Sequence, residues 1–126
     1  MFFLGYIRYA EVPKFLSAMD IAISYIPIVP AFDSQPSGKT VEYLACSLPV
    51  IATNTEGNRR FISNGINGLT CRDDSDSLSK AIIRLCLDIS LRKKLAKNAR
   101  SSIEDYDWRK IVRERIVPAY RKVLWS

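Results

Sequence analysis

Short apolar segments alternate with amphipathic helical segments through the first 71 residues of this 126-residue chain. The helical segments place apolar side chains on one face, as Val12, Phe15 and Leu16 do at positions i, i+3 and i+4. The apolar segments between them are only a few residues long, which is typical of buried strands. Strands that alternate with helices are typical of a parallel sheet with right-handed crossovers. The alternation therefore predicts an α/β fold.

Turn and cap residues indicate where the expected strands and helices begin and end. We expect strands over residues 2–4, 20–26, 49–53 and 69–71. We expect helices over residues 11–19, from Ser37 or Gly38 to residue 48, and over residues 57–63. Residues 27–36 contain three prolines and are expected to form a loop, because proline fits neither a helix interior nor a central strand.

From about residue 74 to residue 126 the pattern predicts a helical tail. Three helices are expected, capped by Asp74 or Asp76, by Asp88 or Ser90, and by Asp107. Pro118 lies inside the last of them. It is expected to kink or interrupt that helix, at a cost of roughly 3 kcal/mol if nothing compensates.

Composition narrows the classes of function. The chain has no histidine, which excludes a Ser-His-Asp centre, a Cys-His centre and a histidine metal site. Its three cysteines are odd in number and widely spaced, which favours a reducing, cytoplasmic setting over a disulfide framework. No apolar stretch is long enough to cross a bilayer, and the first residues do not resemble a signal peptide. The net charge of +6 favours anionic partners: nucleotides, phosphorylated substrates, nucleic acid or an anionic membrane face.

The candidate site lies where the strands of a parallel sheet end, because ligands of such sheets bind beyond the carboxyl ends. Ser37, Gly38 and Lys39 follow the proline-rich loop and open a helix, so free backbone N–H groups and a lysine could meet an anion. Glu42 follows one turn later and could accept hydrogen bonds from two adjacent sugar hydroxyls.

Each of these features also has a structural explanation. Ser37 and Gly38 suit a helix cap and a turn, and Glu42 suits a solvated helix position that complements the dipole. Ser-Gly-Lys-Thr resembles the end of a Walker A loop, but Asp33 stands where that motif needs a glycine. The basic run at residues 92–94 is explained best by a solvated helix face. Because few aromatic residues accompany it, a nucleic-acid partner is not expected.

Five motifs in order resemble the C-terminal part of retaining, nucleotide-sugar-dependent glycosyltransferases of the GT-B fold, family 4 (group 1). They lie at residues 3–6, 12–22, 39–53, 64–69 and 106–108. The resemblance covers nearly the whole chain and is most specific over residues 39–53. It implies a Rossmann-like parallel sheet flanked by helices, forming a single, incomplete nucleotide-sugar-binding domain over residues 1–126.

The resemblance also implies roles for particular residues. Glu42 matches the glutamate that binds the ribose hydroxyls of the donor. The other implied donor-binding positions lie beside the nucleobase, near the phosphates, or in the loop after the next strand: Tyr6, Ile7, Ser37, Gly38, Lys39, Thr53, Thr55 and Gly57. The resemblance implies neither a metal ion nor a cofactor, and no catalytic residue is assigned.

Four positions depart from the family pattern. Ser34 stands where many members carry a second glutamate, and Ser47 stands where a glycine is usual. Glu56 replaces the first glycine of a Gly-Gly pair, and Arg60 replaces an acidic residue three positions beyond that pair. The last two changes bear on the donor geometry of that loop.

The resemblance implies that the acceptor domain and the first strands of the donor domain are missing. The expected function is therefore donor binding in a parent enzyme that transfers a sugar, with retention, to a glycan, lipid-linked or small-molecule acceptor. The chain alone is expected to be inactive, because the groups that stabilise the leaving diphosphate belong to the missing part. The alternative is an inactive α/β module that acts through self-association, protein contacts or an anionic membrane surface. Its expected location is the cytoplasm, peripheral to the inner face of the membrane in that last case.

Overall fold

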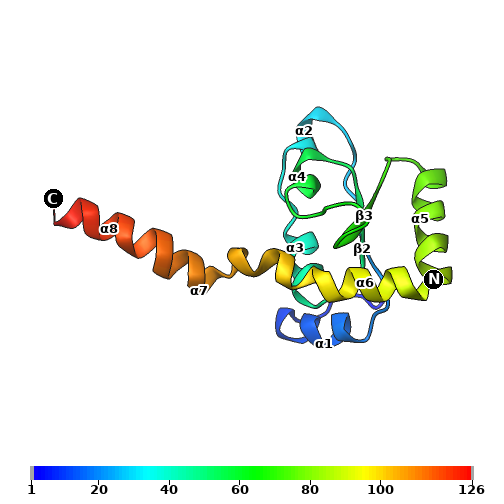
Figure 1. Ribbon diagram of the computed structural model, residues 1–126, viewed down its shortest axis with the longest axis horizontal. Coiled ribbons are helices and arrows are strands. Elements are labelled where there is room, and N and C mark those ends of the chain that lie inside the picture. The colour runs from blue at the N-terminus through cyan, green and yellow to red at the C-terminus, as the bar shows by residue number, and fades with distance from the viewer. Residues whose placement is uncertain (1, 126) are drawn as a thin grey trace.

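The computed structural model describes residues 2–125 and contains a parallel three-stranded sheet with helices on both faces (Figure 1). The strands are β1 (Ala22–Ser24), β2 (Val50–Thr53) and β3 (Gly68–Cys71), in the spatial order β1-β2-β3. Ala22 pairs with Val50, which in turn pairs with Gly68. The predicted α/β fold with a parallel sheet is confirmed.

The helices follow the expected order, with some differences at their ends. The chain runs through η1 (Tyr9–Glu11), α1 (Val12–Ser17), α2 (Pro30–Asp33), α3 (Gly38–Ala45), α4 (Glu56–Arg59), α5 (Ser75–Leu87), α6 (Ile89–Ala99), η2 (Ser101–Tyr106), α7 (Trp108–Ile111), η3 (Val112–Ile116) and α8 (Val117–Leu124). Of these, η1 and η2 are 3-10 helices and η3 is a π-helix.

Two apolar clusters fill the space on either side of β2, which is completely buried. Val50 and Ala52 point to a cluster with Leu44 of α3 and Ile103 of η2, whereas Ile51 points to the opposite face. That second cluster contains Ile51, Leu69, Cys71, Leu85 and Leu95. Helix α6 contributes to both faces, with Leu95 on one and Ala99 on the other. The alternation of side chains along β2 therefore divides the core into one cluster around Val50 and Ala52 and another around Ile51.

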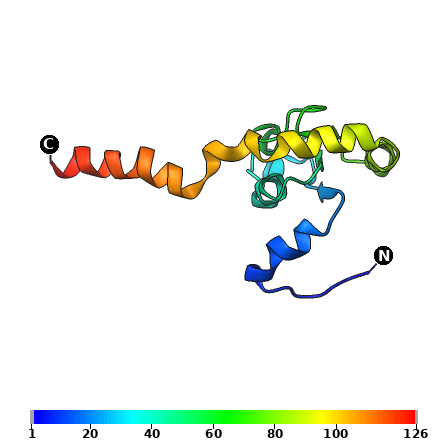
Figure 2. The same cartoon turned by 60° about the horizontal axis from the view of Figure 1, so that its bottom comes forward.

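The predicted strand over residues 2–4 is wrong. These residues form no regular structure, and Phe2 and Phe3 are more than 85 % exposed. Gly5 follows with a left-handed φ of +69°, which turns the chain. Figure 2 shows the segment turning back at the outer end of α1 and running along the side of α1 that faces away from the sheet. Three apolar residues do not make a strand without a neighbouring backbone to accept and donate their hydrogen bonds.

Other predicted boundaries shift by a few residues. The strand expected over residues 20–26 is limited to β1, and the helix expected over residues 57–63 is replaced by the single turn of α4. The proline-rich loop contains one turn of helix, α2, in which Pro30 occupies the first turn, where its missing N–H costs nothing.

The helical tail agrees with the sequence in its caps and in its interruption. Asp74 and Asp88 accept hydrogen bonds from the backbone N–H groups of Ser77 and Leu91 at 2.7 and 2.8 Å. Asp107 caps α7 in the same way. Just before Pro118, η3 forms a π-turn in which Val117 N–H bonds to the carbonyl of Val112, five residues back. The π-turn accommodates the proline, because it shifts the hydrogen-bond register before the missing N–H.

Candidate functional site

The start of α3 is open to solvent beyond the carboxyl ends of β1 and β2. Ser37 is the N-cap, and its hydroxyl accepts the backbone N–H of Thr40 at 3.4 Å. Gly38 is exposed, and a Cβ built on it would meet no atom within 4 Å. The Lys39 ammonium donates to the backbone carbonyl of Tyr25 at 2.8 Å. Free N–H groups, an open glycine and a lysine thus lie together at this helix end.

Glu42 is half-buried on the next turn of α3. It lines a groove of about 160 Å³ between α1 and α3, whose other walls are apolar: Tyr9, Val12, Pro13, Leu16, Ala45 and Cys46. Glu42 is therefore the one charged residue among those that line this groove. Such a groove suits a ligand with a flat apolar part and hydroxyls that a carboxylate can accept.

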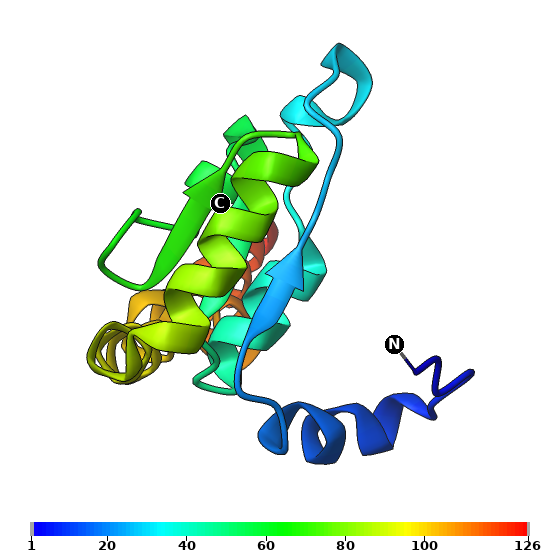
Figure 3. The ribbon, with the colours of Figure 1, turned by 90° about the vertical axis from the view of Figure 1, so that its right-hand side faces the viewer.

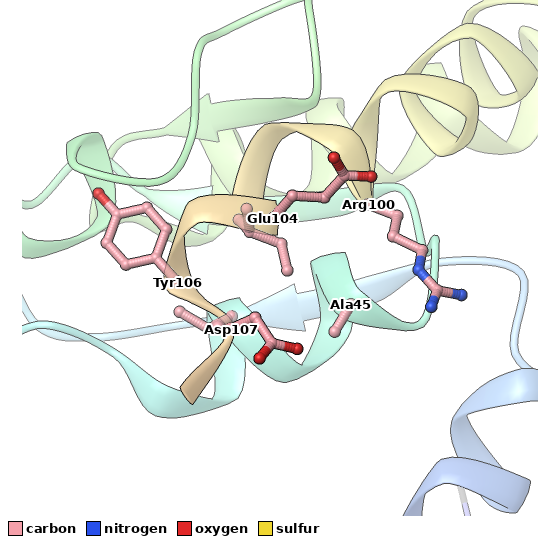
Figure 4. Close-up of a pocket in the computed structure, with 7 residues that line it drawn as sticks. Ala45, Arg100, Glu104, Tyr106 and Asp107 are labelled. Atoms are coloured by element: carbon pink, nitrogen blue, oxygen red, sulfur yellow. The ribbon is translucent and has the colours of Figure 1, made fainter. Parts of the chain in front are cut away.

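A second hollow, of about 330 Å³, lies on a neighbouring face of α3, against η2 (Figure 4). Val41 and Ala45 form its α3 wall, and Arg100, Ile103, Glu104, Tyr106 and Asp107 form the rest. None of the donor-binding residues implied by the resemblance lines this hollow. The groove beside Glu42, not this hollow, therefore belongs to the candidate site.

Beneath the start of α3, buried hydroxyls and one amide form a hydrogen-bonded chain. Thr40 Oγ1 lies 2.7 Å from Ser24 Oγ and 2.9 Å from Asn58 Oδ1. Because Asn58 Oδ1 can only accept, the hydroxyl of Thr40 donates to it, and Ser24 donates to Thr40. Ser37 Oγ, 3.3 Å from Ser24 Oγ, then donates to Ser24. The Ser37 proton is directed inward, so this residue acts as the cap and anchor of α3.

The loop that follows β2 is fixed by its own side chains. Thr53 Oγ1 donates to the carbonyl of Ile26 at 2.7 Å and accepts the Ile26 N–H at 2.9 Å. Thr55 caps α4 by accepting the N–H of Asn58 at 3.1 Å. Both threonines are buried. Their hydroxyls bond within the protein, so these two predicted site residues hold the loops that surround the site.

Gly57 brings two loops into contact. A Cβ built on Gly57 would lie 1.9 Å from the carbonyl oxygen of Gln35, which is far closer than atoms can approach. The Asp33 carboxylate also accepts the N–H of Glu56 at 3.0 Å. The residue at 57 must therefore be glycine for the loop before α3 to pack against α4.

The structure does not bring Tyr6 and Ile7 to the start of α3. Both lie in the irregular segment before η1, where Tyr6 is 92% exposed and Ile7 is partly buried. The exposure of Tyr6 shows that its ring is not packed against the groove.

Asp73 is a residue that the sequence analysis missed. Its carboxylate accepts hydrogen bonds from the hydroxyl of Tyr25 and, at 2.8 Å, from the N–H of Ile28. These bonds lower the pKa of Asp73, and the bond to Asp73 raises the pKa of Tyr25. Asp73 thus ties the loop after β3 to the loop after β1. A lone aspartate beside a helix cap carries no sequence signal for such a contact.

The departures at residues 47 and 60 have visible consequences. Ser47 follows the C-cap residue of α3, Cys46, and adopts a left-handed φ of +58°, a conformation that favours glycine. Arg60 forms an ion pair of 3.0 Å with Glu56, one turn before it. The two residues that break the family pattern in this loop therefore neutralise each other.

Within residues 2–125 no cluster of three or more acidic or cysteine side chains is arranged to hold a metal ion. Over the same residues no helix combines the length and the apolar character that crossing a bilayer requires.

Comparison with known proteins gives a consistent set of relatives. The chain is 30% identical over 97% of its length to the lipopolysaccharide core biosynthesis glycosyltransferase LpsE of Rhizobium meliloti, of which it covers 35%. It is 36% identical over 57% of its length to an uncharacterized glycosyltransferase of Methanocaldococcus jannaschii, of which it covers 21%. The chain therefore spans about a third or less of the length of these relatives.

Solved structures share the fold. Sucrose-phosphate synthase from Thermosynechococcus elongatus superimposes with a TM-score of 0.83 at 25% identity, over 98% of this chain and 30% of that one. The C-terminal domain of a group 1 glycosyl transferase from Francisella tularensis gives 0.63 at 25% identity, over 80% of this chain and 50% of that one. Anabaena HepE in complex with UDP gives a TM-score of 0.74 at 22% identity, over 88% of this chain and 30% of that one.

These structures are GT-B glycosyltransferases, and the aligned part of the Francisella protein is its C-terminal domain. The sequence profile described as "Glycosyl transferases group 1" matches residues 1–102. The chain belongs to the group 1 glycosyltransferases.

Proposed function

We propose that this chain is the donor-binding part of a glycosyltransferase and binds a nucleotide-diphosphate sugar at the start of α3. The observation that carries the proposal is the combination of an open helix end at Gly38, the Lys39 ammonium and the Glu42 carboxylate within two turns of one helix. Anabaena HepE, which shares the fold, is described in complexes with UDP and with UDP-glucose.

Each group has a chemical role in this proposal. The diphosphate lies at the N-terminus of α3, where free N–H groups and Lys39 meet its charge. Glu42 accepts hydrogen bonds from the ribose hydroxyls, and the apolar groove beside it receives the base. Tyr6 and Ile7, in the segment before η1, belong to the proposed base site on the resemblance alone. Because Lys39 and the helix end supply the positive charge, the proposal requires no metal ion.

The parent reaction is the transfer of a sugar, with retention of configuration, from this donor to a glycan, lipid-linked or small-molecule acceptor. The relatives named above are a little under three times the length of this chain. A second polypeptide segment that carries the acceptor site completes the enzyme in this proposal.

Titration of the ¹⁵N-labelled chain with UDP, followed by NMR, tests donor binding. The expected result is saturable shifts of the Gly38 and Lys39 amides at millimolar UDP or below, which Glu42→Ala removes or weakens at least about tenfold, a loss of about 1.4 kcal/mol. Glu114→Ala is the matched control, because Glu114 lies on the C-terminal helix. The absence of any shift at residues 37–42 would contradict the proposal.

A second function, self-association, is favoured by one observation. Among the described residues β1 pairs only with β2, which leaves its other edge open, as Figure 3 shows. An open parallel edge readily pairs with a second copy. Analytical ultracentrifugation at two concentrations tests this, and a monomer at both would exclude it.

A further inference from the structure

We propose that Thr40 and Asn58 are positioning residues of the donor site. Their buried side chains connect the first turn of α3 to the ends of β1 and β2, and so fix where the helix end presents its N–H groups. The inference rests on the proposed function, because it concerns affinity for the same nucleotide.

The connection on the α3 side is made by one hydroxyl. Thr40 is completely buried, although it lies only two residues after the open Gly38. Its hydroxyl accepts from Ser24 at the end of β1, at 2.7 Å, and donates to Asn58 at 2.9 Å. The hydroxyl of Thr40 thus donates one hydrogen bond and accepts another, each with a partner from another element.

The connection on the β2 side is made by one amide. Asn58 is also completely buried, and its Nδ2 donates to the carbonyl of Thr53 at 2.9 Å. Its backbone N–H bonds to Thr55 at 3.1 Å. Asn58 therefore holds α3 through its Oδ1 and the last residue of β2 through its Nδ2.

The hydrogen bonds all run in one direction, from Ser37 through Ser24 and Thr40 to Asn58 and the Thr53 carbonyl. Hydrogen bonds in such a chain polarise one another, and burial makes each more costly to break. No buried side-chain nitrogen or oxygen of the described residues lacks a partner. A slide of α3 along the sheet would break several of these bonds together, so the helix end stays in one position before a ligand arrives.

This rigidity matters for an anion, because N–H groups bind a diphosphate only from a fixed distance and direction. The network also reaches the loop around Gly57, which packs against Gln35. The same buried hydrogen bonds therefore fix the positions of the helix end and of the two loops beside it. None of these side chains needs to touch the nucleotide.

The test compares Thr40→Val, which keeps the shape of the side chain and removes the hydroxyl, with Thr40→Ser, which keeps the hydroxyl. We expect Thr40→Val to weaken UDP binding at least about tenfold in the NMR titration. Thr40→Ser should stay within about twofold of the parent chain. Thr70→Val, on β3 and outside the network, is the matched control. Amide spectra recorded without ligand verify that each variant is folded.

A purely structural role predicts a different pattern, because stability would fall while the affinity of the folded fraction stayed the same. A folded Thr40→Val chain with unchanged UDP affinity would overturn the positioning role, even where Glu42→Ala still abolishes binding. Absence of UDP binding by the parent chain would overturn both proposals.

Should Thr40→Val not fold, a second variant tests the same role. Ser24→Ala removes the hydroxyl that donates to Thr40 and keeps the Thr40–Asn58 hydrogen bond. It is expected to weaken binding about threefold, and unchanged affinity there also overturns the role.

Discussion

The body of the molecule and its C-terminal helix differ in what holds them together. In the body, residues such as Leu44, Val50 and Ile51 are completely buried. The continuous helix formed by α7, η3 and α8, which we call the projecting helix, contains no buried residue and extends away from the body (Figure 1). The body therefore has its own core, whereas the projecting helix depends on local hydrogen bonds and on whatever covers its apolar side chains.

The net charge also differs between the body and the projecting helix. Residues 108–125 contain six basic residues and one acidic residue, so they carry +5 of the net charge of +6. The body with the candidate site is close to neutral. The overall charge is thus not evidence for an anionic donor, and the affinity for a diphosphate must come from the local groups at the start of α3.

The largest contrast is expected between two leucines, one in each region. Leu44→Ala removes a completely buried side chain and should lower the free energy of unfolding by about 2–5 kcal/mol. Leu124→Ala, on the projecting helix, should change it by about 0.5 kcal/mol or less, because Leu124 is 71% exposed. Urea unfolding followed by circular dichroism measures both. Tryptophan fluorescence would not report on the body, because Trp108 and Trp125 both lie at the ends of the projecting helix.

Equal losses of unfolding free energy in Leu44→Ala and Leu124→Ala would contradict the difference between the body and the projecting helix. They would show that the projecting helix is packed in solution, for example against a second copy of the chain.

Gly57→Ala should give the next largest effect, about 1–3 kcal/mol of destabilisation, because its methyl group would overlap the backbone of Gln35. Gly38→Ala is the matched control. Its methyl group meets no atom, so the fold should be unchanged or slightly more stable. The same urea experiment measures both variants. A Gly57→Ala chain as stable as the parent would show that the loop before α3 moves away from α4 without cost.

The sequence allowed the prediction of the elements whose signal is local. The caps at Ser37, Asp88 and Asp107 and the interruption near Pro118 depend on neighbours within five residues, and the structure contains all of them. The strand at residues 2–4 failed because strand formation depends on a distant partner, which three apolar residues do not reveal.

In the candidate site, too, the features with a local sequence signal could be predicted and those that depend on distant contacts could not. The helix start at residues 37–39 could be predicted, because a cap, a glycine and a lysine in sequence are a local pattern. The inward direction of the Ser37 hydroxyl and the role of Asn58 could not, since both depend on contacts more than ten residues apart. The same holds for Asp73, which bonds to Tyr25 across 48 positions.

Ser47→Gly should stabilise the body by about 1 kcal/mol, since glycine adopts the left-handed conformation of residue 47 without steric cost. Thermal unfolding measures the change as a higher midpoint. Serine at residue 63, which is also exposed but does not have a positive φ, gives the control substitution Ser63→Gly, expected to be neutral or destabilising. A lower midpoint for Ser47→Gly would mean that the serine side chain offsets its backbone strain.

The smallest effect is expected from the pH dependence of the Asp73 contact. Two hydrogen bonds lower the pKa of this carboxyl below its usual value of 3.8. A lowered pKa in the folded state means that the contribution to stability is complete above pH 3.8 and is lost as the pH falls through the lower, folded value. The carboxylate is solvent-exposed, so the effect on global stability should be small.

The local effect of Asp73 should appear in the amide signal of Ile28, whose N–H bonds to Asp73. In an NMR titration toward low pH this signal should move with a midpoint below 3.8, and Asp73→Asn should abolish the transition. A midpoint at or above 3.8 would show that the loop after β1 is not held by Asp73, and the candidate site would then be fixed by the buried network alone.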